Sequence, residues 1–218
     1  RQILYSLEVF MKKIVGICGL IGHGKDTVAG YLIENNFQRI SFAGVLKDAC
    51  ANIFGWDRIL LEGNTPESRV FREQVDEWWA KRLDIPNFTP RWALQHVGTD
   101  VFRMNFHPDI WVAACERQVE MTDKNVVISD CRFYNELDVI KRLGGKTTVV
   151  WRKAKPEWWD NACKANQTVS DNMINPMNRY PDVHKSEYSW AGWDFDIEFD
   201  NSGDLENLYS QVSDLLST

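Results

Sequence analysis

Short apolar runs alternate with longer amphipathic stretches along this chain. Runs typical of strands lie at residues 14–18, 39–42, 126–130, 147–151 and 195–199, and the stretches between them have the spacing of helices. Strands that alternate with helices predict a parallel sheet covered by helices on both faces. The expected fold class is therefore α/β, a three-layer parallel sheet.

The clearest unit of this pattern begins at the strand expected at 126–130. A helical pattern follows that strand, a Gly-Gly pair stops the helix, and the run 147–151 completes a βαβ unit. Ligands of parallel sheets bind beyond the carboxyl ends of the strands. Asp130 and Arg132 fall at such an end, which makes them candidates for a ligand site.

Residues 89–104 are expected to form one helix, with Thr89 as its N-cap and Pro90 in its first turn. Gly98 interrupts this helix and costs about 1 kcal/mol relative to alanine. Either another part of the chain approaches the backbone closely at Gly98, which we favour, or the helix is simply imperfect.

The stretch 153–190 loses periodicity and becomes rich in Asn, Pro, Lys and Trp, so it is expected to form a lid or inserted segment. It contains the pair Trp158-Trp159, and an earlier pair is Trp78-Trp79. Adjacent residues on a helix face different ways, so these indoles are expected to fill the core or cover the surface rather than stack on bases.

The length of 218 residues predicts one domain with an inserted lid. Residues 1–10 precede Met11 and lack the features of a signal peptide, so they are expected to be an extension or a tag-derived segment, with the domain at 11–218. The chain contains no run of about 18 apolar residues, so no membrane span is expected.

The net charge of −6 argues against polymeric nucleic acid as a partner, because displacing its counterions needs a basic face. Small phosphorylated ligands remain compatible with this charge. The five cysteines include no C-x-x-C pair, which fits a reducing, cytoplasmic setting. The four histidines lack zinc-site spacing, so no structural metal is indicated.

The most informative stretch is G-L-I-G-H-G-K-D-T at 19–27, which lies between the strand at 14–18 and a helix that starts near Lys25. It matches the phosphate-loop pattern G-x-x-x-x-G-K-[ST], in which backbone N–H groups surround phosphate oxygens and the lysine reaches the outer phosphates. A nucleotide polyphosphate is therefore the expected ligand, and Mg²⁺ would arrive with it. The alternative is an ordinary glycine-rich turn between a strand and a helix.

Asp26 departs from this pattern, because it stands where the Ser or Thr that ligates magnesium is expected. Thr27 follows one place late. A carboxylate at a helix N-terminus is favoured by the helix dipole and could hold Mg²⁺ directly or through water. Both Asp26 and Thr27 are therefore candidate metal ligands.

A phosphate loop alone fits kinases, GTPases, motors and transport ATPases, although the lack of an N-K-x-D sequence weakens the GTPase alternative. Arginines follow several different elements, and each either clamps phosphate oxygens or simply lies on the surface: Arg69, Arg72, Arg91, Arg103, Arg132 and Arg152. A nucleotide monophosphate acceptor would need no catalytic base, because its second pKa is near 6. Catalysis would then reduce to alignment and electrostatic stabilisation.

Six motifs occur in order along the chain: G-K-D-T at 24–27, S-F-A-G-V-L-K-D-A at 41–49, L-Q-H-V-G-T-D at 94–100, D-I-W-V at 109–112, D-C-R-F-Y-N-E at 130–136 and H-K-S-E at 184–187. Together they resemble the bacteriophage-type deoxynucleoside monophosphate kinases, and the resemblance covers nearly all of the chain from Met11 to the C-terminus. The resemblance implies transfer of the γ-phosphoryl group of ATP to a dNMP, giving ADP and a dNDP. It also implies an adenylate-kinase-like P-loop fold, with ATP and Mg²⁺ as cofactors.

The resemblance also implies roles for individual residues. The catalytic residues would be Lys25, Asp26, Asp130, Arg132 and Arg152. ATP would be held by Gly22, His23, Gly24, Lys25, Asp26, Thr27, Val28 and Asn201. The dNMP would be held by Leu46, Lys47, Arg69, Arg72, Arg91, Gly98, Thr99, Trp111 and Asp130, with the choice between Arg69 and Arg72 left open. Asp26 or Thr27 would hold the metal.

The resemblance and the sequence pattern also suggest where substrate and lid lie and what the partner is. Substrate would bind a helical region at about 56–105, and the lid would span about 153–190. His23 would contribute its backbone more than its side chain, and its simplest interpretation is a solvent-facing loop residue. The partner would be a small-molecule dNMP, with a homodimer possible, in the cytoplasm or in the host cytoplasm if the chain is phage-encoded.

Two other readings remain open. One is another small-molecule P-loop kinase, such as a dephospho-coenzyme A or phosphomevalonate kinase, which a panel of acceptors would separate. The other is a non-catalytic module that binds ATP without transferring phosphate. Retained Lys25, Asp130 and Arg132 argue against the module, because pure binding needs no clamp on a transferred group.

Overall fold

The computed structural model describes residues 12–167 and 175–217. These residues divide into two compact units. Residues 12–39 and 120–217 form a unit that contains the sheet, and residues 40–119 form a helical unit.

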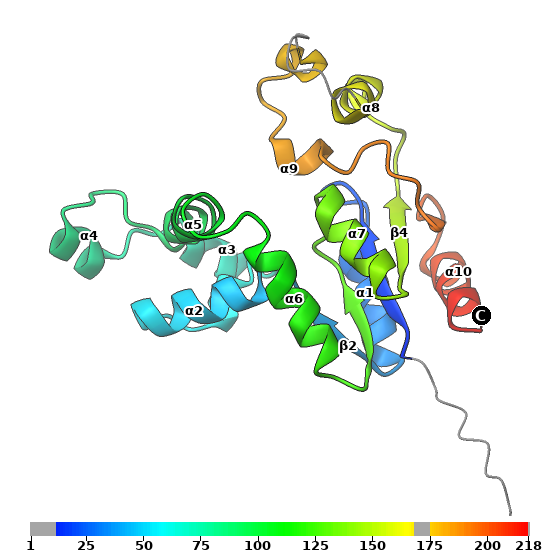
Figure 1. Ribbon diagram of the computed structural model, residues 1–218, viewed down its shortest axis with the longest axis horizontal. Coiled ribbons are helices and arrows are strands. Elements are labelled where there is room, and N and C mark those ends of the chain that lie inside the picture. The colour runs from blue at the N-terminus through cyan, green and yellow to red at the C-terminus, as the bar shows by residue number, and fades with distance from the viewer. Residues whose placement is uncertain (1–11, 168–174, 218) are drawn as a thin grey trace, which may run out of the picture. The chain divides into compact units, whose positions relative to one another are not determined.

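The sheet has five strands in the order β2-β3-β1-β4-β5 (Figure 1). They are β1 (Ile14–Cys18), β2 (Phe37–Ile40), β3 (Asn125–Ile128), β4 (Lys146–Trp151) and β5 (Ile197–Asp200). β1 pairs in parallel with β3 on one side and with β4 on the other, and β4 pairs in parallel with β5. Each connection between these parallel strands crosses over through helix, as the alternating sequence pattern predicts.

Helices cover both faces of this sheet. Side chains alternate along β1, and Val15 and Ile17 pack against α1 (Lys25–Glu34) and α10 (Leu205–Ser217). Gly16 faces the opposite way, toward α7 (Tyr134–Arg142), where a Cβ would lie 2.2 Å from Ile140 Cδ1. The predicted three-layer α/β fold is confirmed.

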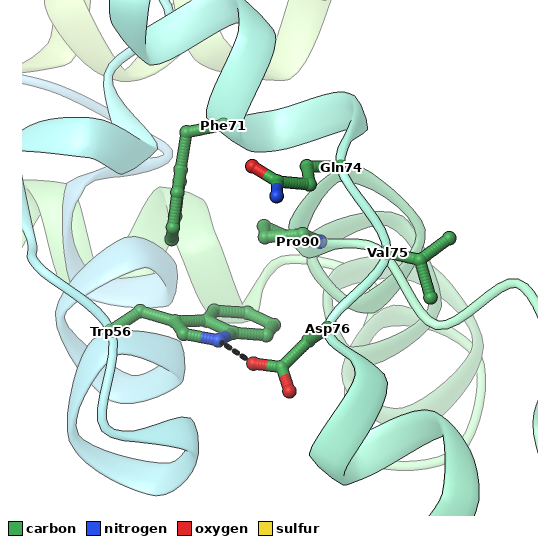
Figure 2. Close-up of a pocket in the computed structure, with 6 residues that line it drawn as sticks. All are labelled: Trp56, Phe71, Gln74, Val75, Asp76 and Pro90. Carbon is green, nitrogen blue, oxygen red and sulfur yellow. Dashed lines mark hydrogen bonds between the residues drawn. The ribbon is translucent and has the colours of Figure 1, made fainter.

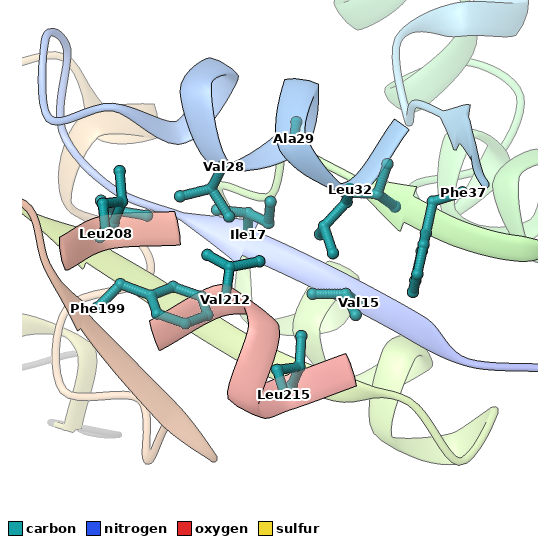
Figure 3. Close-up of a cluster of buried hydrophobic side chains, with 12 residues drawn as sticks. Val15, Ile17, Val28, Ala29, Leu32, Phe37, Phe199, Leu208, Val212 and Leu215 are labelled. Carbon is teal, nitrogen blue, oxygen red and sulfur yellow. The ribbon is translucent and has the colours of Figure 1, made fainter. Parts of the chain in front are cut away.

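The core between the sheet, α1 and α10 is a cluster of buried aliphatic side chains closed by two phenylalanines (Figure 3). Its members are Val15, Ile17, Val28, Ala29, Leu32, Phe37, Val127, Val150, Phe199, Leu208, Val212 and Leu215. Burying one such large side chain stabilises the fold by about 1.5–3 kcal/mol. The cluster therefore holds α1 and α10 against this face of the sheet.

The strand boundaries differ from the pattern at most ends. β1 is as predicted, but the strand expected at 39–42 lies at Phe37–Ile40, because Gly44 N donates to Ser41 O and turns the chain into the next helix. β3 ends at Ile128, two residues before Asp130. β5 begins two residues later than expected, and β4 one residue earlier.

The helical unit contains seven segments: α2 (Gly44–Phe54), η1 (Ile59–Leu61), α3 (Pro66–Glu73), α4 (Glu77–Leu83), α5 (Pro90–Gln95), η2 (His96–Arg103) and α6 (Ile110–Glu120). Side-chain caps begin three of these helices, since Thr65, Asp76 and Thr89 each accept a hydrogen bond from a backbone N–H in the first turn. Their apolar faces close on two clusters, one around Leu46, Leu61 and Trp111 and one around Phe88.

The prediction of a single helix at 89–104 is wrong in part. Thr89 is the N-cap as predicted, but α5 ends at Gln95 and the chain continues as a π-helix, η2. The close approach expected at Gly98 is confirmed, because a Cβ there would lie 2.6 Å from Leu46 Cδ2. Trp111 Nε1 also donates to Gly98 O at 2.9 Å. Packing of Trp111 and Leu46 against the backbone at Gly98 thus offsets the free-energy cost of glycine in this irregular helix.

The segment after β4 contains α8 (Trp159–Gln167), η3 (Pro176–Arg179) and α9 (Lys185–Tyr188), and residues 168–174 of the expected lid lie outside the described residues (Figure 1). Trp159 is buried and packs against Trp151 and Trp190. In the helical unit Trp78 lies on the surface, whereas Trp79 Nε1 donates to Phe54 O. The tryptophans fill the core or cover the surface, as predicted.

All five cysteines are free thiols, and burial raises the pKa of Cys50 to about 11. Within residues 12–167 and 175–217, none of the helices is both long and apolar enough to span a membrane. The extension expected at 1–10 lies outside the described residues.

The core between α10 and the sheet predicts a matched pair of stability effects. Leu208 is fully buried and Leu205 on the same helix is 54% exposed. Leu208→Ala should lower the free energy of unfolding by about 2–5 kcal/mol, because it removes buried methyl groups and leaves a cavity. Leu205→Ala should change it by less than about 0.5 kcal/mol. Urea denaturation measures both, and equal losses would contradict the packing of α10.

Candidate phosphate-binding site

The loop between β1 and α1 has the backbone that the glycine-rich motif predicts. Gly22 has φ of 79° and Gly24 has φ of 104°, both in the left-handed region that side chains disfavour. At Gly24 there is also no space, because a Cβ would lie 2.3 Å from Asn201 Nδ2. Glycine is therefore required where the loop turns into α1.

Asn201 holds this loop from the turn that follows the edge strand β5. It follows β5, is 7% exposed, and donates from Nδ2 to His23 O at 2.9 Å. Its own N–H donates to Trp151 O at 2.7 Å. The structure thus brings the predicted Asn201 to the loop, where its amide fixes the backbone.

His23 is not the solvent-facing residue that was expected, because only 6% of it is exposed. Its Nδ1 accepts a hydrogen bond from Arg152 N at 3.3 Å, and its ring lies edge-on to Trp151 with centroids 5.7 Å apart. Burial lowers the pKa of His23, and the charges of Lys25 and Lys153 lower it further. The imidazole is therefore buried in its neutral form between the loop and the end of β4.

Lys25 begins α1 and turns back into the loop, where Nζ donates to Leu20 O at 3.2 Å. Burial lowers the pKa of Lys25, and the positive charge of Arg132 lowers it further. Two cations therefore share this end of the sheet. Such a pair favours an anion, because a bound phosphate relieves their repulsion.

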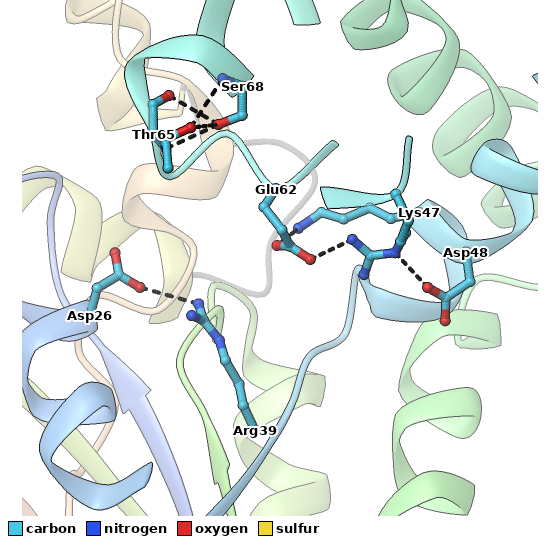
Figure 4. A network of polar contacts seen from close by, with 8 residues as sticks. Asp26, Arg39, Lys47, Asp48, Glu62, Thr65 and Ser68 are labelled. Atoms are coloured by element: carbon cyan, nitrogen blue, oxygen red, sulfur yellow. Dashed lines mark hydrogen bonds and ion pairs between the residues drawn. The ribbon is translucent and has the colours of Figure 1, made fainter. Parts of the chain in front are cut away.

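Asp26 lies in the first turn of α1 and pairs with Arg39, with 3.2 Å between Oδ1 and Nη2 (Figure 4). Their side chains are 75% and 41% exposed, so this pair adds little stability and its carboxylate can exchange partners. Thr27 follows with its N–H on Gly24 O. Val28 belongs to the core, so only its backbone borders the loop.

Arg132 lies just after the carboxyl end of β3 and is held by two carboxylates. Glu136 accepts hydrogen bonds from Arg132 N at 2.8 Å and from Phe133 N at 3.2 Å. Glu187 accepts from Arg132 Nη1 at 2.6 Å. Asp130 lies beside them at the same end of β3, as the strand pattern predicts.

Sequence reasoning missed Arg39, Glu136 and Glu187 as partners of candidate site residues. Glu136 carried a signal, since it is the third residue of α7 and such a carboxylate often reaches back to the N–H groups before the helix. Glu187 belongs to the H-K-S-E motif, but the motif does not say that its partner is Arg132, and Arg39 carried no signal at all. Among the described residues, no three His, Cys, Asp or Glu side chains form a metal cluster.

The helical unit holds the residues expected to bind a monophosphate. Lys47 Nζ lies 2.7 Å from Glu62 Oε2, and Glu62 also pairs with Arg58 (Figure 4). Burial alone would raise the pKa of Glu62, but its bonds to Lys47 and Arg58 hold it below the ordinary value. Leu46 and Trp111 are buried around Gly98, whereas Thr99 is exposed on η2.

The two candidate arginines of α3 differ. Arg69 is exposed and its Nε donates to Gly63 O at 3.2 Å. Arg72 Nε is buried and finds no hydrogen-bond partner among the residues that the structure describes. Burial lowers the pKa of Arg72, and the charge of Arg91 lowers it further. Arg91 itself pairs with Glu73.

A separate cavity of about 210 Å³ lies in the same unit, lined by Trp56, Phe71, Gln74, Val75, Asp76 and Pro90 (Figure 2). Trp56 Nε1 donates to Asp76 Oδ2 at 2.8 Å across its floor. The predicted substrate residues do not line it.

No family model matches the chain. One curated relative, a protein of Acanthamoeba polyphaga mimivirus named "Putative deoxynucleotide monophosphate kinase", is 30% identical over 217 residues. That alignment covers 91% of this chain and 93% of the relative. The chain belongs to the deoxynucleotide monophosphate kinase family. The family resemblance carried by the six sequence motifs is thereby confirmed.

Solved structures match this kinase only weakly. A dephospho-CoA kinase from Campylobacter jejuni is 15% identical, with a TM-score of 0.43 over 95% of this chain and 97% of that one. A shikimate kinase from Bacteroides thetaiotaomicron is 13% identical, with a TM-score of 0.37 over 94% of this chain and 97% of that one. Likeness at this level says nothing about substrate. Family membership makes the protein a phosphotransferase.

The buried imidazole of His23 predicts how the stability of the kinase depends on pH. Its pKa lies below the ordinary 6.5, so the unfolded chain binds the proton more readily than the folded one. The stabilisation is complete above pH 6.5 and declines as the pH falls below that value toward the lowered pKa. Urea denaturation of wild type between pH 5 and 7.5 should show this decline.

Two variants isolate the contribution of His23 to that profile. His23→Asn keeps an acceptor for Arg152 N without a titrating ring, so its profile should be flatter than that of wild type. The exposed His107 serves as the control, and His107→Asn should leave the profile unchanged. A His23→Asn profile identical to wild type would contradict the buried, neutral imidazole.

Proposed function

We propose that this kinase transfers the γ-phosphoryl group of ATP to a deoxynucleoside monophosphate, giving ADP and the diphosphate. The observation that carries the proposal is the phosphate loop with its left-handed turn at Gly24. Lys25 of this loop and Arg132 after β3 place two positive charges at the carboxyl end of the sheet. The name of the mimivirus relative supports the choice of acceptor.

The residues present fit ATP with Mg²⁺. Gly22 and Gly24 have the left-handed backbone of a phosphate loop, and Lys25 Nζ contacts a carbonyl of the same loop. The exposed carboxylate of Asp26 and the hydroxyl of Thr27 are hard oxygen ligands at the start of α1. When bound, Mg²⁺–ATP supplies the phosphoryl group and neutralises part of its charge.

The catalytic work of the chain is alignment and charge stabilisation. Lys25 and Arg132 carry positive charge at the place where phosphate would bind, and Arg152 follows β4 at the same end of the sheet. Asp130 orients the substrates at the end of β3. The acceptor phosphate is mostly a dianion at neutral pH, so no side chain has to remove a proton before attack.

The acceptor binds the helical unit through Leu46, Lys47, Arg91, Gly98, Thr99 and Trp111. Arg72 is the better candidate for the monophosphate than Arg69, because a half-buried guanidinium beside Arg91 gains more from an anion than an exposed one does. Trp111 acts indirectly, since its indole is bonded to Gly98 O. The free thiols and the nucleotide substrate suit a cytoplasmic enzyme.

A coupled ADP-release assay tests the reaction with ATP, Mg²⁺ and each of dTMP, dGMP, dCMP, dAMP and the matching ribonucleotides. We expect turnover with deoxy acceptors and a dNDP product on chromatography. Lys25→Ala should lower kcat at least about 100-fold, as loss of a preorganised charged donor does, while the thermal melt stays that of a folded protein.

Other outcomes of the panel identify the alternatives. Silence with every nucleotide and turnover with dephospho-coenzyme A or phosphomevalonate would replace the acceptor. ATP binding or hydrolysis without a phosphorylated acceptor would favour a module that only binds nucleotide. Full activity of Lys25→Ala would remove the phosphate-loop assignment.

The two arginines of α3 give a matched test of the acceptor site. Arg72→Ala should raise the KM for the dNMP by about 10–100-fold with a smaller change in kcat, because a charged hydrogen bond contributes about 1.5–3 kcal/mol. Arg69→Ala should change that KM less than threefold. The reverse order in steady-state kinetics would assign the monophosphate to Arg69.

A further inference from the structure

The carboxylate of Glu187 meets the guanidinium of Arg132 although 55 residues separate them in the chain. The distance between Nη1 and Oε1 is 2.6 Å, and the two side chains are 37% and 21% exposed. This pair is shorter and less exposed than the pair of Asp26 and Arg39, whose Oδ1 and Nη2 lie 3.2 Å apart. The difference lies mainly in the carboxylate, and a partly buried carboxylate holds its geometry better than an exposed one.

The segment that carries Glu187 is firmly anchored. Asn166 Nδ2 donates to Tyr188 O at 2.7 Å and to Ala191 O at 2.9 Å, and Tyr134 OH donates to Ala191 O at 3.1 Å. Trp190 is 1% exposed. These contacts tie the residues that follow Glu187 to α8 and α7, so the chain just after the carboxylate has a defined place.

The other end of the pair is equally constrained. Glu136, itself 2% exposed, accepts from the backbone N–H of Arg132. Arg132 is therefore fixed at its backbone by Glu136 and at its guanidinium by Glu187. The ion pair occupies one of the five N–H donors of the guanidinium, so the fork keeps donors for phosphate oxygens.

The ion pair also reduces the repulsion between Arg132 and Lys25. The charge of Arg132 lowers the pKa of Lys25, and the charges of Asp26 and then Glu187 oppose that effect. Of these two carboxylates, Glu187 is the one that is bonded to Arg132, and its charge offsets the repulsion between the two cations. With Glu187 in place the guanidinium can stay beside Lys25 before any nucleotide binds.

We propose that Glu187 is the positioning residue of Arg132: it holds the guanidinium toward Lys25 so that Arg132 stabilises the charge on the transferred phosphoryl group. Glu187 acts through Arg132 and touches no substrate itself. This inference rests on the proposed phosphoryl transfer. Preorganisation of this kind raises kcat more than it tightens substrate binding, because the cost of orienting the donor is met before the reaction.

Glu187→Gln keeps the shape of the side chain and removes its charge. We expect kcat to fall about 10–100-fold, while the KM values for ATP and the dNMP change less than threefold. Glu187→Asp keeps the charge and should recover part of kcat. Glu157→Gln, an exposed acid at the entry to α8, is the matched control and should behave as wild type.

A double-mutant cycle separates positioning from general damage to the fold. In an Arg132→Ala background, Glu187→Gln should change kcat less than twofold, because the group that it orients is gone. The same 10–100-fold loss in that background would overturn the inference. Unchanged kcat in Glu187→Gln would also overturn it, and a raised kcat would show instead that the pair restrains the enzyme.

A binding measurement keeps this test independent of the acceptor. The affinity for ADP, Mg²⁺ and aluminium fluoride, a mimic of the transferred group, should weaken about tenfold in Glu187→Gln, and the affinity for ADP alone less than threefold. Equal affinities in both proteins overturn the role of Glu187. Wild-type silence with all dNMPs overturns the proposed function instead, and the binding result still decides the inference.

Discussion

The hydrogen bond from Asn201 to the carbonyl of His23 is the constraint on which the phosphate loop depends. It ties the turn after β5, at the edge of the sheet, to a loop that follows the central strand β1. The side-chain amide of Asn201 fills the space that a Cβ of residue 24 would occupy, so only glycine fits at this position. Loop shape, the start of α1 and the position of Lys25 all follow from a contact 178 residues apart in the sequence.

Several charged candidate residues are already paired with opposite charges inside the protein. Asp26 has Arg39, Arg132 has Glu187, and Lys47 has Glu62. These partners differ in exposure, and therefore in how readily they yield. The exposed carboxylate of Asp26 can turn to a metal at little cost, whereas the shielded Arg132 pair is better suited to hold a geometry.

Sequence patterns predicted the parts of this fold that depend on local chemistry. The strand β1, the glycine loop, the βαβ unit after Asn125 and the Thr89 cap all follow from short-range rules. The failures have tertiary causes: His23 is buried because Trp151 and the N–H of Arg152 lie over it, and the helix after Gln95 widens where other side chains press on Gly98. Ion pairs between distant residues leave no mark in the sequence.

The π-helix η2 constrains how many residues this part of the chain contains. Met104 N reaches back five residues to Thr99 O, and His107 N does the same to Phe102 O. Each residue turns a helix by about 100°, so one insertion or deletion here would swing Gly98 away from the indole of Trp111. Loops of the protein can lengthen in evolution without such an effect, but this stretch of helix has to keep its count.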